Sequence, residues 1–427
     1  MNILVIGSGG REHAIVRKLK ENPKVETIYC IPGNGGIAAL AECVPIGAKD
    51  IPAIVDFAVK NSVDYAVVAP DDPLVLGAVD ALENAGIPCF GPRKNAAIIE
   101  GSKAFSKELM KKYGIPTAAY ETFDDADKAV EYVRSLNEGN IVVKADGLAL
   151  GKGVIIAANK QEAEDAVLSM MRDKAFGESG SKVVIEEFLT GPEVSVLSFT
   201  DGETVVPMVS SMDHKRALDG DRGLNTGGMG TVAPNPYYTA EIAKECMDTI
   251  FLPTIRAMKA EGRPFKGCLY FGLMLTEKGP KVIEYNCRFG DPETQVVLPL
   301  LESDLLTVME ATTNGTLDKT DVKFSDGAAA CVILASGGYP LAYEKGKEIT
   351  GLTAGQLDAA DVTVYHAGTA IKDGRLVTNG GRVLGVTATA NALPEALKKA
   401  YAATESIHFD KLHKRSDIGA RALAAMQ

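Results

Sequence analysis

The chain has 427 residues, of which 46% are hydrophobic and 24% are charged, and its formal net charge is −11. One hydrophobic core rarely serves a chain of this length, so we expect two to four domains. The residue balance is that of a globular protein and excludes a fibrous or disordered class. Because nucleic-acid binding normally needs a basic surface, the negative charge argues against DNA or RNA as a partner. An anionic substrate would need positive charge gathered locally in a cleft.

The seven cysteines are scattered and never spaced as C-x-x-C, which predicts neither a disulfide framework nor a zinc site. No stretch approaches the length of a membrane span. Residues 1–10 are typical of the first strand of a folded domain and not of a signal peptide. We therefore expect a cytoplasmic protein that does not bind a membrane.

The first hundred residues alternate short apolar runs with helical patterns. Strands are expected at 2–6, 27–31, 65–69 and 88–90, and helices at 12–20, 51–60 and 95–113. Continuous apolar strands that alternate with helices predict a doubly wound parallel sheet. This part of the chain is therefore predicted to be α/β.

The pattern of predicted strands and helices then changes twice. Between 141 and 287, hairpin signals between strands indicate antiparallel α+β structure, and after about 326 a smaller unit follows. Strands are expected at 141–144, 153–157, 183–187, 194–199, 204–209, 267–275, 281–287, 328–335, 362–365 and 382–389, and helices at 239–261 and from 393.

The first candidate site is the turn GSGGREH at residues 7–13, which follows an apolar run and opens a helical pattern. Glycines let the backbone approach a phosphate, and a helix N-terminus supplies N–H donors and positive potential. His13 replaces the third glycine of a dinucleotide-binding turn, and no acidic residue follows the second strand, at 31–34. The turn favours an anion site over a purely structural turn, and either over nicotinamide binding.

The second candidate is Lys144, which ends an apolar run and precedes a loop rich in glycine and lysine at 147–153. A buried ammonium group is costly unless it meets an anion. Backbone N–H groups of such a loop can surround phosphates. This combination favours phosphate binding over a solvated lysine beside a flexible hairpin.

The third candidate is the strand that carries Glu284, Asn286 and Arg288, whose side chains share one face because they are two residues apart. Carboxylate and amide oxygens are hard ligands that suit Mg²⁺. The adjacent arginine suits a carboxylate or a transferring phosphoryl group. The alternative is an ordinary strand with one solvated face.

The fourth candidate joins the charged segment 213–216 (DHKR) to the glycine-rich stretch 223–230. Clustered Asp, Lys and Arg side chains beside a glycine loop suit a substrate that carries an amine together with a phosphate or carboxylate. On charge alone, a surface loop would be equally favoured, and the glycine run tips the interpretation towards a functional site.

These motifs recur with others in a fixed order along nearly the whole chain. They are GSGGREHA at 7–14, PGNGG at 32–36, EGSKAF at 100–105, KADGLALGKGV at 144–154, IEEFLTGPEVS at 185–195, DHKR at 213–216, NTGGMG at 225–230, IEYNCRFGDPETQ at 283–295, ASGGYP at 335–340, YHAGT at 365–369 and VTNGGRVL at 377–384. The ordered set resembles the ATP-grasp superfamily and, within it, the family of phosphoribosylamine–glycine ligases, also called glycinamide ribonucleotide synthetases.

The resemblance implies an ATP-dependent carbon–nitrogen ligase of de novo purine biosynthesis. Its substrates would be glycine and 5-phosphoribosylamine, with ATP and Mg²⁺ (or Mn²⁺) as cofactors. Glycine would be activated as glycyl phosphate, and its transfer to the amine would give glycinamide ribonucleotide, ADP and phosphate. The protein would be a monomer or a weak homodimer.

The resemblance also assigns residues to the nucleotide and the metal. Those expected at the ATP phosphates are Lys103, Lys144, Gly147, Gly151, Lys152 and Gly153. Those expected at the adenosine are Glu186, Glu187, Leu189 and Glu193. The first three would meet adenine largely through backbone groups, and the last would hold the ribose. Those expected to ligate the metal are Glu284 and Asn286.

Further residues are assigned to the other two substrates. Those expected at glycine and the acyl phosphate are Arg288, Asp213 and Lys215. Those expected to seat phosphoribosylamine are Gly9, Gly10, Arg11, Glu12, Pro70 and Asp71. The glycine-rich substrate loop is expected to contribute Asn225, Thr226, Gly227 and Gly228.

The sequence departs from the family at three places. Asp71 stands where the family usually has glutamate, and Leu224 where it usually has proline before NTGGMG. The strand before the metal strand, 270–275, offers no acidic ligand, unlike that of many ATP-grasp enzymes. The metal set would then be Glu284 and Asn286, completed by phosphate oxygens and water.

The fold expected from the resemblance is α/β and α+β with ATP-grasp architecture. The division is an N-terminal doubly wound domain at 1–102, a central ATP-grasp domain at 103–325 with a mobile lid at about 118–190, and a small C-terminal domain at 326–427. A different ATP-grasp ligase, such as a carboxylase, is disfavoured by DHKR and NTGGMG. A nicotinamide-dependent oxidoreductase leaves the second and third motifs unexplained. An inactive paralogue is disfavoured because Lys103, Lys144, Glu284, Asn286 and Arg288 are all present.

Overall fold

The computed structural model describes residues 1–148, 153–352 and 361–427. Its N-terminal part is a five-stranded parallel sheet in the order β3-β2-β1-β4-β5. The strands are β1 (Asn2–Gly7), β2 (Thr27–Pro32), β3 (Glu42–Cys43), β4 (Tyr65–Val68) and β5 (Cys89–Phe90), and the helices are α1 (Gly10–Lys20), α2 (Ile51–Lys60), α3 (Asp71–Leu76) and α4 (Ala78–Asn84). This order is doubly wound about β1, as the apolar strands predict.

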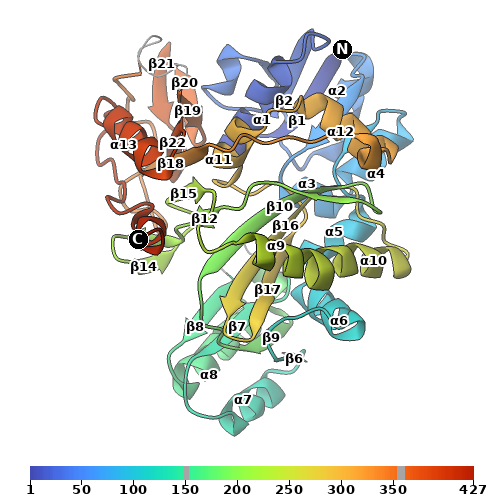
Figure 1. The fold of residues 1–427 in the computed structure, drawn as a ribbon, viewed down its shortest axis with the longest axis vertical. Coiled ribbons are helices and arrows are strands. Elements are labelled where there is room, and N and C mark those ends of the chain that lie inside the picture. The colour runs from blue at the N-terminus through green and yellow to red at the C-terminus, as the bar shows by residue number, and fades with distance from the viewer. Residues whose placement is uncertain (149–152, 353–360) are drawn as a thin grey trace.

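The central part contains two four-stranded antiparallel sheets. The body sheet has the order β11-β10-β16-β17, formed by β10 (Glu193–Thr200), β11 (Val205–Pro207), β16 (Gly267–Thr276) and β17 (Gly279–Asn286). The lobe sheet has the order β6-β9-β7-β8, formed by β6 (Tyr120–Phe123), β7 (Ile141–Ala145), β8 (Val154–Ala157) and β9 (Val183–Glu187). Helices α7 (Ala126–Ser135) and α8 (Lys160–Met171) belong to the same lobe as this sheet, at the bottom of Figure 1.

Two predicted helices are interrupted in the structure. The helix expected at 95–113 is two helices, α5 (Lys94–Gly101) and α6 (Lys103–Tyr113), because Ser102 is extended and its hydroxyl accepts the Phe105 N–H as an N-cap. The helix expected at 239–261 is α9 (Ala240–Cys246) and α10 (Leu252–Ala260), joined by a π-helical turn at Met247–Phe251. Pro253, in the first turn of α10, has no N–H to continue the regular ladder.

The C-terminal sheet has the order β12-β15-β18-β22-β19 and is antiparallel. Its strands are β12 (Met212–Asp213), β15 (Gly230–Ala233), β18 (Ala328–Ala335), β19 (Val362–His366) and β22 (Arg382–Ala390). Separate hairpins are formed by β13 (Arg216–Leu218) with β14 (Arg222–Asn225) and by β20 (Thr369–Lys372) with β21 (Arg375–Thr378). The remaining helices are α11 (Thr294–Val297), α12 (Leu305–Asn314), α13 (Leu393–Thr404) and α14 (Ala420–Ala425). The segment from β12 to β15 is thus built onto strands that lie about a hundred residues later.

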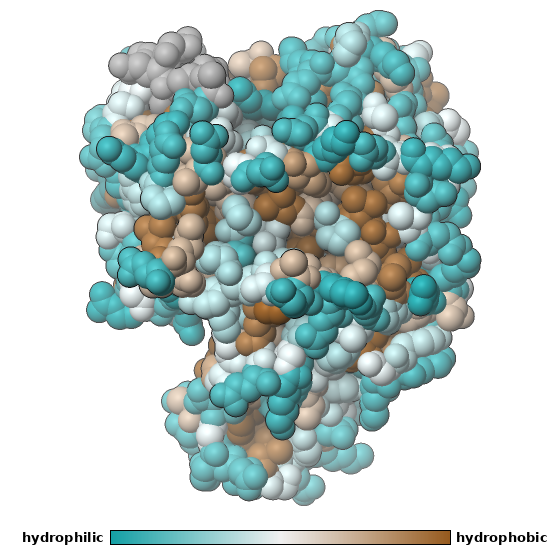
Figure 2. Space-filling model, viewed as in Figure 1, coloured by the Kyte–Doolittle hydropathy of each residue, from teal (hydrophilic) through white to brown (hydrophobic). Residues whose placement is uncertain are grey.

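In Figure 2 the molecule is a broad body with a narrower lobe below it, and hydrophilic residues cover most of the rim of the face shown. The lobe has its own hydrophobic cluster, which includes Val143, Val167 and Ile185. The N-terminal sheet and the body sheet share a core through residues such as Leu4 and Phe271. No helix of the described residues is long and apolar enough to cross a membrane. The lobe is therefore a separately packed unit beside a continuous body.

Candidate active site

Strand β17 presents Glu284 and Asn286 from one face of the body sheet. Val282 and Tyr285 are buried in the core, whereas Glu284 and Asn286 are only partly buried. Glu284 lies opposite Gly272 on β16, at a register shift. A Cβ atom at Gly272 would lie 2.9 Å from Glu284 Cγ, so glycine leaves room for the glutamate side chain. The backbone therefore fixes where this carboxylate stands.

Positive charge surrounds the Glu284 carboxylate. Lys215 Nζ donates to its Oε1 at 3.1 Å. The charges of Lys215, then Lys144 and Arg288, outweigh burial and lower the pKa of Glu284 to about 2. The same pairing raises the pKa of Lys215 well above its usual range. At neutral pH the carboxylate is therefore ionised.

Arg288 follows β17 and contacts Asn286, as the alternation of the strand predicts. Its Nη2 donates to Asn286 Oδ1 at 3.2 Å and lies 3.1 Å from Glu100 Oε1 on α5. Glu100 also accepts the Cys287 N–H at 2.7 Å. Burial raises the pKa of Glu100 and the charge of Arg288 opposes that rise. Among the described residues, the buried Nε of Arg288 has no hydrogen-bond partner, so one donor of the guanidinium is unsatisfied.

The lysines expected at phosphates come from α6 and from the lobe sheet. Lys103 Nζ donates to the Gly147 carbonyl at 3.0 Å, and Lys144 Nζ donates to the Ile283 carbonyl at 2.9 Å. Burial lowers the pKa of Lys103, while the charge of Glu284 opposes this. Both lysines therefore lie where the lobe meets β17. Gly151 and Lys152 lie outside the described residues.

Glu186 on β9 lies buried between two lysines. Lys144 Nζ is 3.0 Å from its Oε1, and Lys107 Nζ is 3.0 Å from its Oε2. Oε1 accepts no aligned hydrogen bond from the described residues, so the Lys144 contact is purely ionic. Burial lowers the pKa of Lys107 to about 8. The Glu186 carboxylate is therefore paired with lysines of α6 and β7.

The other residues expected at adenosine lie at the end of β9 and the start of β10. Glu187 is exposed and pairs with Lys281 at 3.0 Å. Leu189 is partly buried. Glu193 is exposed and lines a hollow of about 220 Å³ with Gly191, Pro192, Met212, Tyr237 and Arg421.

The substrate loop at 225–228 folds back onto Lys215 and Asp213. Thr226 donates to the Lys215 carbonyl through its N–H at 2.7 Å and its hydroxyl at 2.9 Å. Gly228 has φ +122°, and a Cβ there would lie 2.5 Å from Asp213 Oδ1. Only glycine suits both constraints. Asn225 ends β14, and the Gly227 N–H donates to the Tyr339 hydroxyl at 3.0 Å.

Asp213 stands in a partly buried group of charges. Burial raises its pKa well above the usual range, the charge of Glu293 adds to this, and Lys215 and Arg382 oppose it. Arg382, on β22, donates to the Gly227 carbonyl at 2.9 Å and to the Asp291 carbonyl at 2.7 Å. The C-terminal sheet therefore reaches the substrate loop directly.

The N-terminal turn is held by its own side chains. Glu12 accepts the Gly9 N–H and the Arg11 Nε–H, each at 2.5 Å. The Arg11 N–H donates to Asp291 Oδ2 at 3.2 Å, and a Cβ at Gly10 would meet Gln295. The Glu12 carboxylate thus lies at the start of α1, where an anion is favourable.

Pro70 precedes α3, and Asp71 is its first residue. The charge of Asp71 contributes to raising the pKa of both Glu100 and Arg288. Asp71 therefore lies on the Arg288 side of the site.

Four functional candidates did not emerge from the sequence: Glu100, Lys107, Glu293 and Arg382. Glu100 and Arg382 each lie within a motif that points to the family, at 100–105 and 377–384, and Glu293 lies within 283–295. Their position in those motifs was the available signal. Lys107 lies outside every motif, and only the folded helix brings it to Glu186.

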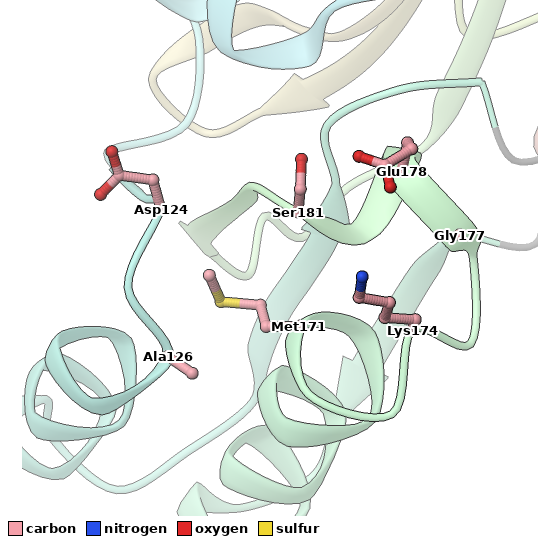
Figure 3. Close-up of a pocket in the computed structure, with 7 residues that line it drawn as sticks. All are labelled: Asp124, Ala126, Met171, Lys174, Gly177, Glu178 and Ser181. Carbon is pink, nitrogen blue, oxygen red and sulfur yellow. The ribbon is translucent and has the colours of Figure 1, made fainter.

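The hollow in Figure 3, of about 190 Å³, lies elsewhere on the lobe. Its lining comes from the start of α7, the end of α8 and the turn near Gly177, and includes Lys174 and Glu178. None of the predicted site residues lines it. It is therefore separate from the charged cluster around β17.

Glu284 and Asn286 offer two oxygen ligands for a divalent cation. The described residues contain no group of three or more His, Cys, Asp or Glu side chains that could hold a metal. Mg²⁺ commonly takes only one or two protein ligands and completes its shell with phosphate oxygens and water. The ionised Glu284 beside the Asn286 amide fits that mode.

Family models match most of the chain. Models for the N domain, the ATP-grasp (A) domain and the C domain of phosphoribosylglycinamide synthetase match residues 1–100, 101–294 and 329–421. A phosphoribosylamine–glycine ligase from Vibrio vulnificus is 50% identical over 430 aligned residues and 100% of both chains. The bifunctional purine biosynthetic protein PUR2,5 of Pichia angusta is 48% identical over 99% of this chain and 54% of its own length.

Solved structures agree as well. The phosphoribosylamine–glycine ligase of Thermotoga maritima is 35% identical with a TM-score of 0.85, over 98% of this chain and 100% of its own. A biotin carboxylase domain from Hydrogenobacter thermophilus shares the fold alone, at 18% identity and a TM-score of 0.74, over 100% of this chain and 94% of its own. The predicted ATP-grasp architecture is confirmed. The chain belongs to the family of phosphoribosylamine–glycine ligases.

Proposed function

We propose that the protein joins glycine to 5-phosphoribosylamine with ATP, giving glycinamide ribonucleotide, ADP and phosphate. The observation that carries this proposal is the cluster of Lys144, Lys215 and Arg288 around Glu284. In a protein of negative net charge, these cationic side chains are concentrated around one carboxylate that is suited to bind a metal. Such a cluster matches phosphoryl transfer, which depends mainly on positioning and charge neutralisation.

In the first step, a glycine carboxylate oxygen attacks the γ-phosphorus of ATP and the bond to ADP breaks. Lys103 and Lys144 would bind the phosphates. Lys103 Nζ donates to one backbone carbonyl, and Lys144 Nζ donates to another and pairs with Glu186, so both have N–H groups left for a phosphate. A divalent cation held by Glu284 and Asn286, for which we propose Mg²⁺ with Mn²⁺ as the alternative, would neutralise phosphate charge. The free Nε–H of Arg288 is a donor for the acyl phosphate.

In the second step, the phosphoribosylamine nitrogen attacks the glycyl carbonyl, loses a proton, and phosphate leaves. Asp213 and Lys215 lie on the side of the substrate loop, where we place glycine's ammonium beside Asp213. Phosphoribosylamine would lie between the Gly9–Glu12 turn and the Pro70–Asp71 turn, with the loop residues Asn225 to Gly228 closing the site. The lobe, about 118–190, would exclude water from the acyl phosphate, because Lys144 already joins it to β17.

Oxygen labelling tests the acyl phosphate directly. With glycine labelled with ¹⁸O in its carboxylate, one ¹⁸O should appear in each phosphate released, because the phosphate leaves with a carboxylate oxygen. Mass spectrometry of the phosphate measures this, and ¹⁸O-water with unlabelled glycine is the control. Label that enters from water and not from glycine would contradict the mechanism.

A further inference from the structure

The C-terminal segment, residues 413–421, lies against the part of the chain that carries Asp213 and Lys215. Figure 1 places the C-terminus beside β14 and close to β12. The segment reaches the body through His413, whose backbone pairs with Ala335 on β18 and whose ring contacts the Ala217 carbonyl at 2.7 Å. It therefore connects the C-terminal sheet to the β13–β14 hairpin.

Arg415 is the centre of this contact and is only 1% exposed. Its guanidinium donates to both carboxylate oxygens of Asp417, at 2.7 and 2.8 Å. It also donates to the Arg216 carbonyl at 3.1 Å and to Asp221 Oδ1 at 3.0 Å. A buried guanidinium is stable only when its donors are used, so the surrounding acceptors are held in place.

Hydrogen bonds with the hairpin turn, residues 219–221, complete the contact. Asp417 Oδ2 accepts the Gly220 N–H at 2.8 Å, and Asp219 accepts the Ser416 N–H at 2.8 Å. A two-stranded hairpin alone is marginally stable in water. The β13–β14 hairpin therefore depends on the C-terminal segment for its position.

The base of that hairpin is the substrate loop. Lys215 directly precedes β13, and Thr226 directly follows β14. Both Thr226 hydrogen bonds to the Lys215 carbonyl close this base. A displacement of the hairpin would therefore move Lys215 away from Glu284.

His214, between Asp213 and Lys215, provides a second connection. Its Nε2 lies 3.0 Å from the Gly419 nitrogen and must accept, since the backbone N–H is the donor. Its Nδ1 therefore carries the proton and donates to the Gly230 carbonyl at 3.0 Å. The ring is 1% exposed, so both bonds are shielded from water.

We propose that the C-terminal segment positions Asp213 and Lys215 for glycine, with Arg415 and His214 as positioning residues. This rests on the proposed function, because glycine is the substrate assigned to Asp213 and Lys215. Neither positioning residue touches a substrate. Their effect would appear in the use of glycine and not in the use of ATP, whose lysines lie on α6 and the lobe sheet.

Two substitutions of His214 separate positioning from general destabilisation. His214→Asn keeps a donor near the Gly230 carbonyl and removes the acceptor of Gly419. His214→Gln places an amide oxygen near the Nε2 position and keeps that acceptor. We expect the KM for glycine to rise about tenfold or more in His214→Asn, with the KM for ATP within about twofold of wild type. His214→Gln should restore the KM for glycine to within about threefold.

Arg415→Lys should raise the KM for glycine in the same way, because lysine cannot bond Asp417, Asp221 and the Arg216 carbonyl together. If this variant does not fold, the comparison of His214→Asn with His214→Gln tests the inference. Arg375→Gln is the control, since this exposed arginine pairs with exposed Glu348 and with no other carboxylate of the described residues, and wild-type kinetics are expected.

Equal KM values for glycine in His214→Asn and wild type would overturn the inference. So would equal increases in the KM values for glycine and ATP, or an equal loss in both His214 variants. A wild-type protein that forms no amide from glycine would instead refute the proposed function itself.

Discussion

At the residue scale, the strand that carries Glu284 and Asn286, with Arg288 just beyond its end, could be read from the sequence, but the partners of these residues could not. Alternation in a strand predicts that Asn286 and Arg288 are neighbours, and they are. Lys215 is 69 residues from Glu284, and Glu100 lies in a helix with no local relation to Arg288. Such pairs depend on how the sheets and helices pack, which no local pattern encodes.

Replacing Glu284 tests its role in metal binding. Glu284→Ala should lower kcat by about a thousandfold, because a ligand to the cation is lost. The free energy of unfolding should change by less than about 1 kcal/mol, since the pair with Lys215 is partly exposed. Steady-state kinetics and urea denaturation measure both.

Glu277→Ala, at the exposed turn between β16 and β17, is the matched control and should keep full activity. Near-wild-type kcat in Glu284→Ala at limiting Mg²⁺ would refute the metal role.

The pH dependence of stability tests the environment of His214. Burial, with smaller effects of Arg415 and Arg421, lowers the pKa of His214 to about 4, while the Gly230 carbonyl and Asp221 oppose this. Between about pH 6.5 and 4 the unfolded chain binds the extra proton and the folded protein does not, so stability falls as pH falls. Urea denaturation should show that the loss of unfolding free energy from pH 7 to 4.5 is smaller in His214→Gln by about 2 kcal/mol.

Burial also lowers the pKa of His13, and His13 contributes equally to the pH dependence of stability in wild type and variant. Identical pH dependence in the two proteins would show that His214 is not held neutral.

At the element scale, individual strands and helices follow from apolar runs and periodicity. The breaks within two predicted helices depend on single residues. Ser102 divides α5 from α6, and Pro253 accompanies the π-helical turn between α9 and α10. The pairing of β15 with β18 could not be predicted either, because strands so far apart in sequence share no local signal. The short strands β12 to β14 carry too few residues for a periodicity.

The N-cap of α6 lies next to Lys103, which we propose to bind ATP. The Ser102 hydroxyl accepts the Phe105 N–H and donates to Asp146 at 2.9 Å, next to Lys103. Ser102→Ala should cost about 1 kcal/mol of stability. It should also raise the KM for ATP several-fold, because the start of α6 positions Lys103.

Thr239→Ala removes the N-cap of α9 and is the control, with a similar stability loss and an unchanged KM for ATP. If Ser102→Ala and Thr239→Ala have the same KM for ATP, the start of α6 does not contribute to nucleotide binding.

At the scale of the whole molecule, the site joins parts that are distant in sequence. The lobe supplies Lys144, the body sheet supplies Glu284, and the C-terminal sheet supplies Arg382 at the substrate loop. The ordered motifs matched a family across nearly the whole chain, and the site residues that they indicate stay predictions. They did not predict that segment 212–233 pairs with β18, which places the C-terminal sheet beside the proposed substrate loop.

The most direct test of the account is the coupling of ADP formation to amide formation. The protein would be mixed with Mg-ATP, glycine and freshly generated 5-phosphoribosylamine, and ADP and glycinamide ribonucleotide would be quantified together. The account predicts equal amounts of the two products, and neither when glycine is omitted. ADP release that ignores glycine, or an amide that contains another amino acid, would contradict it.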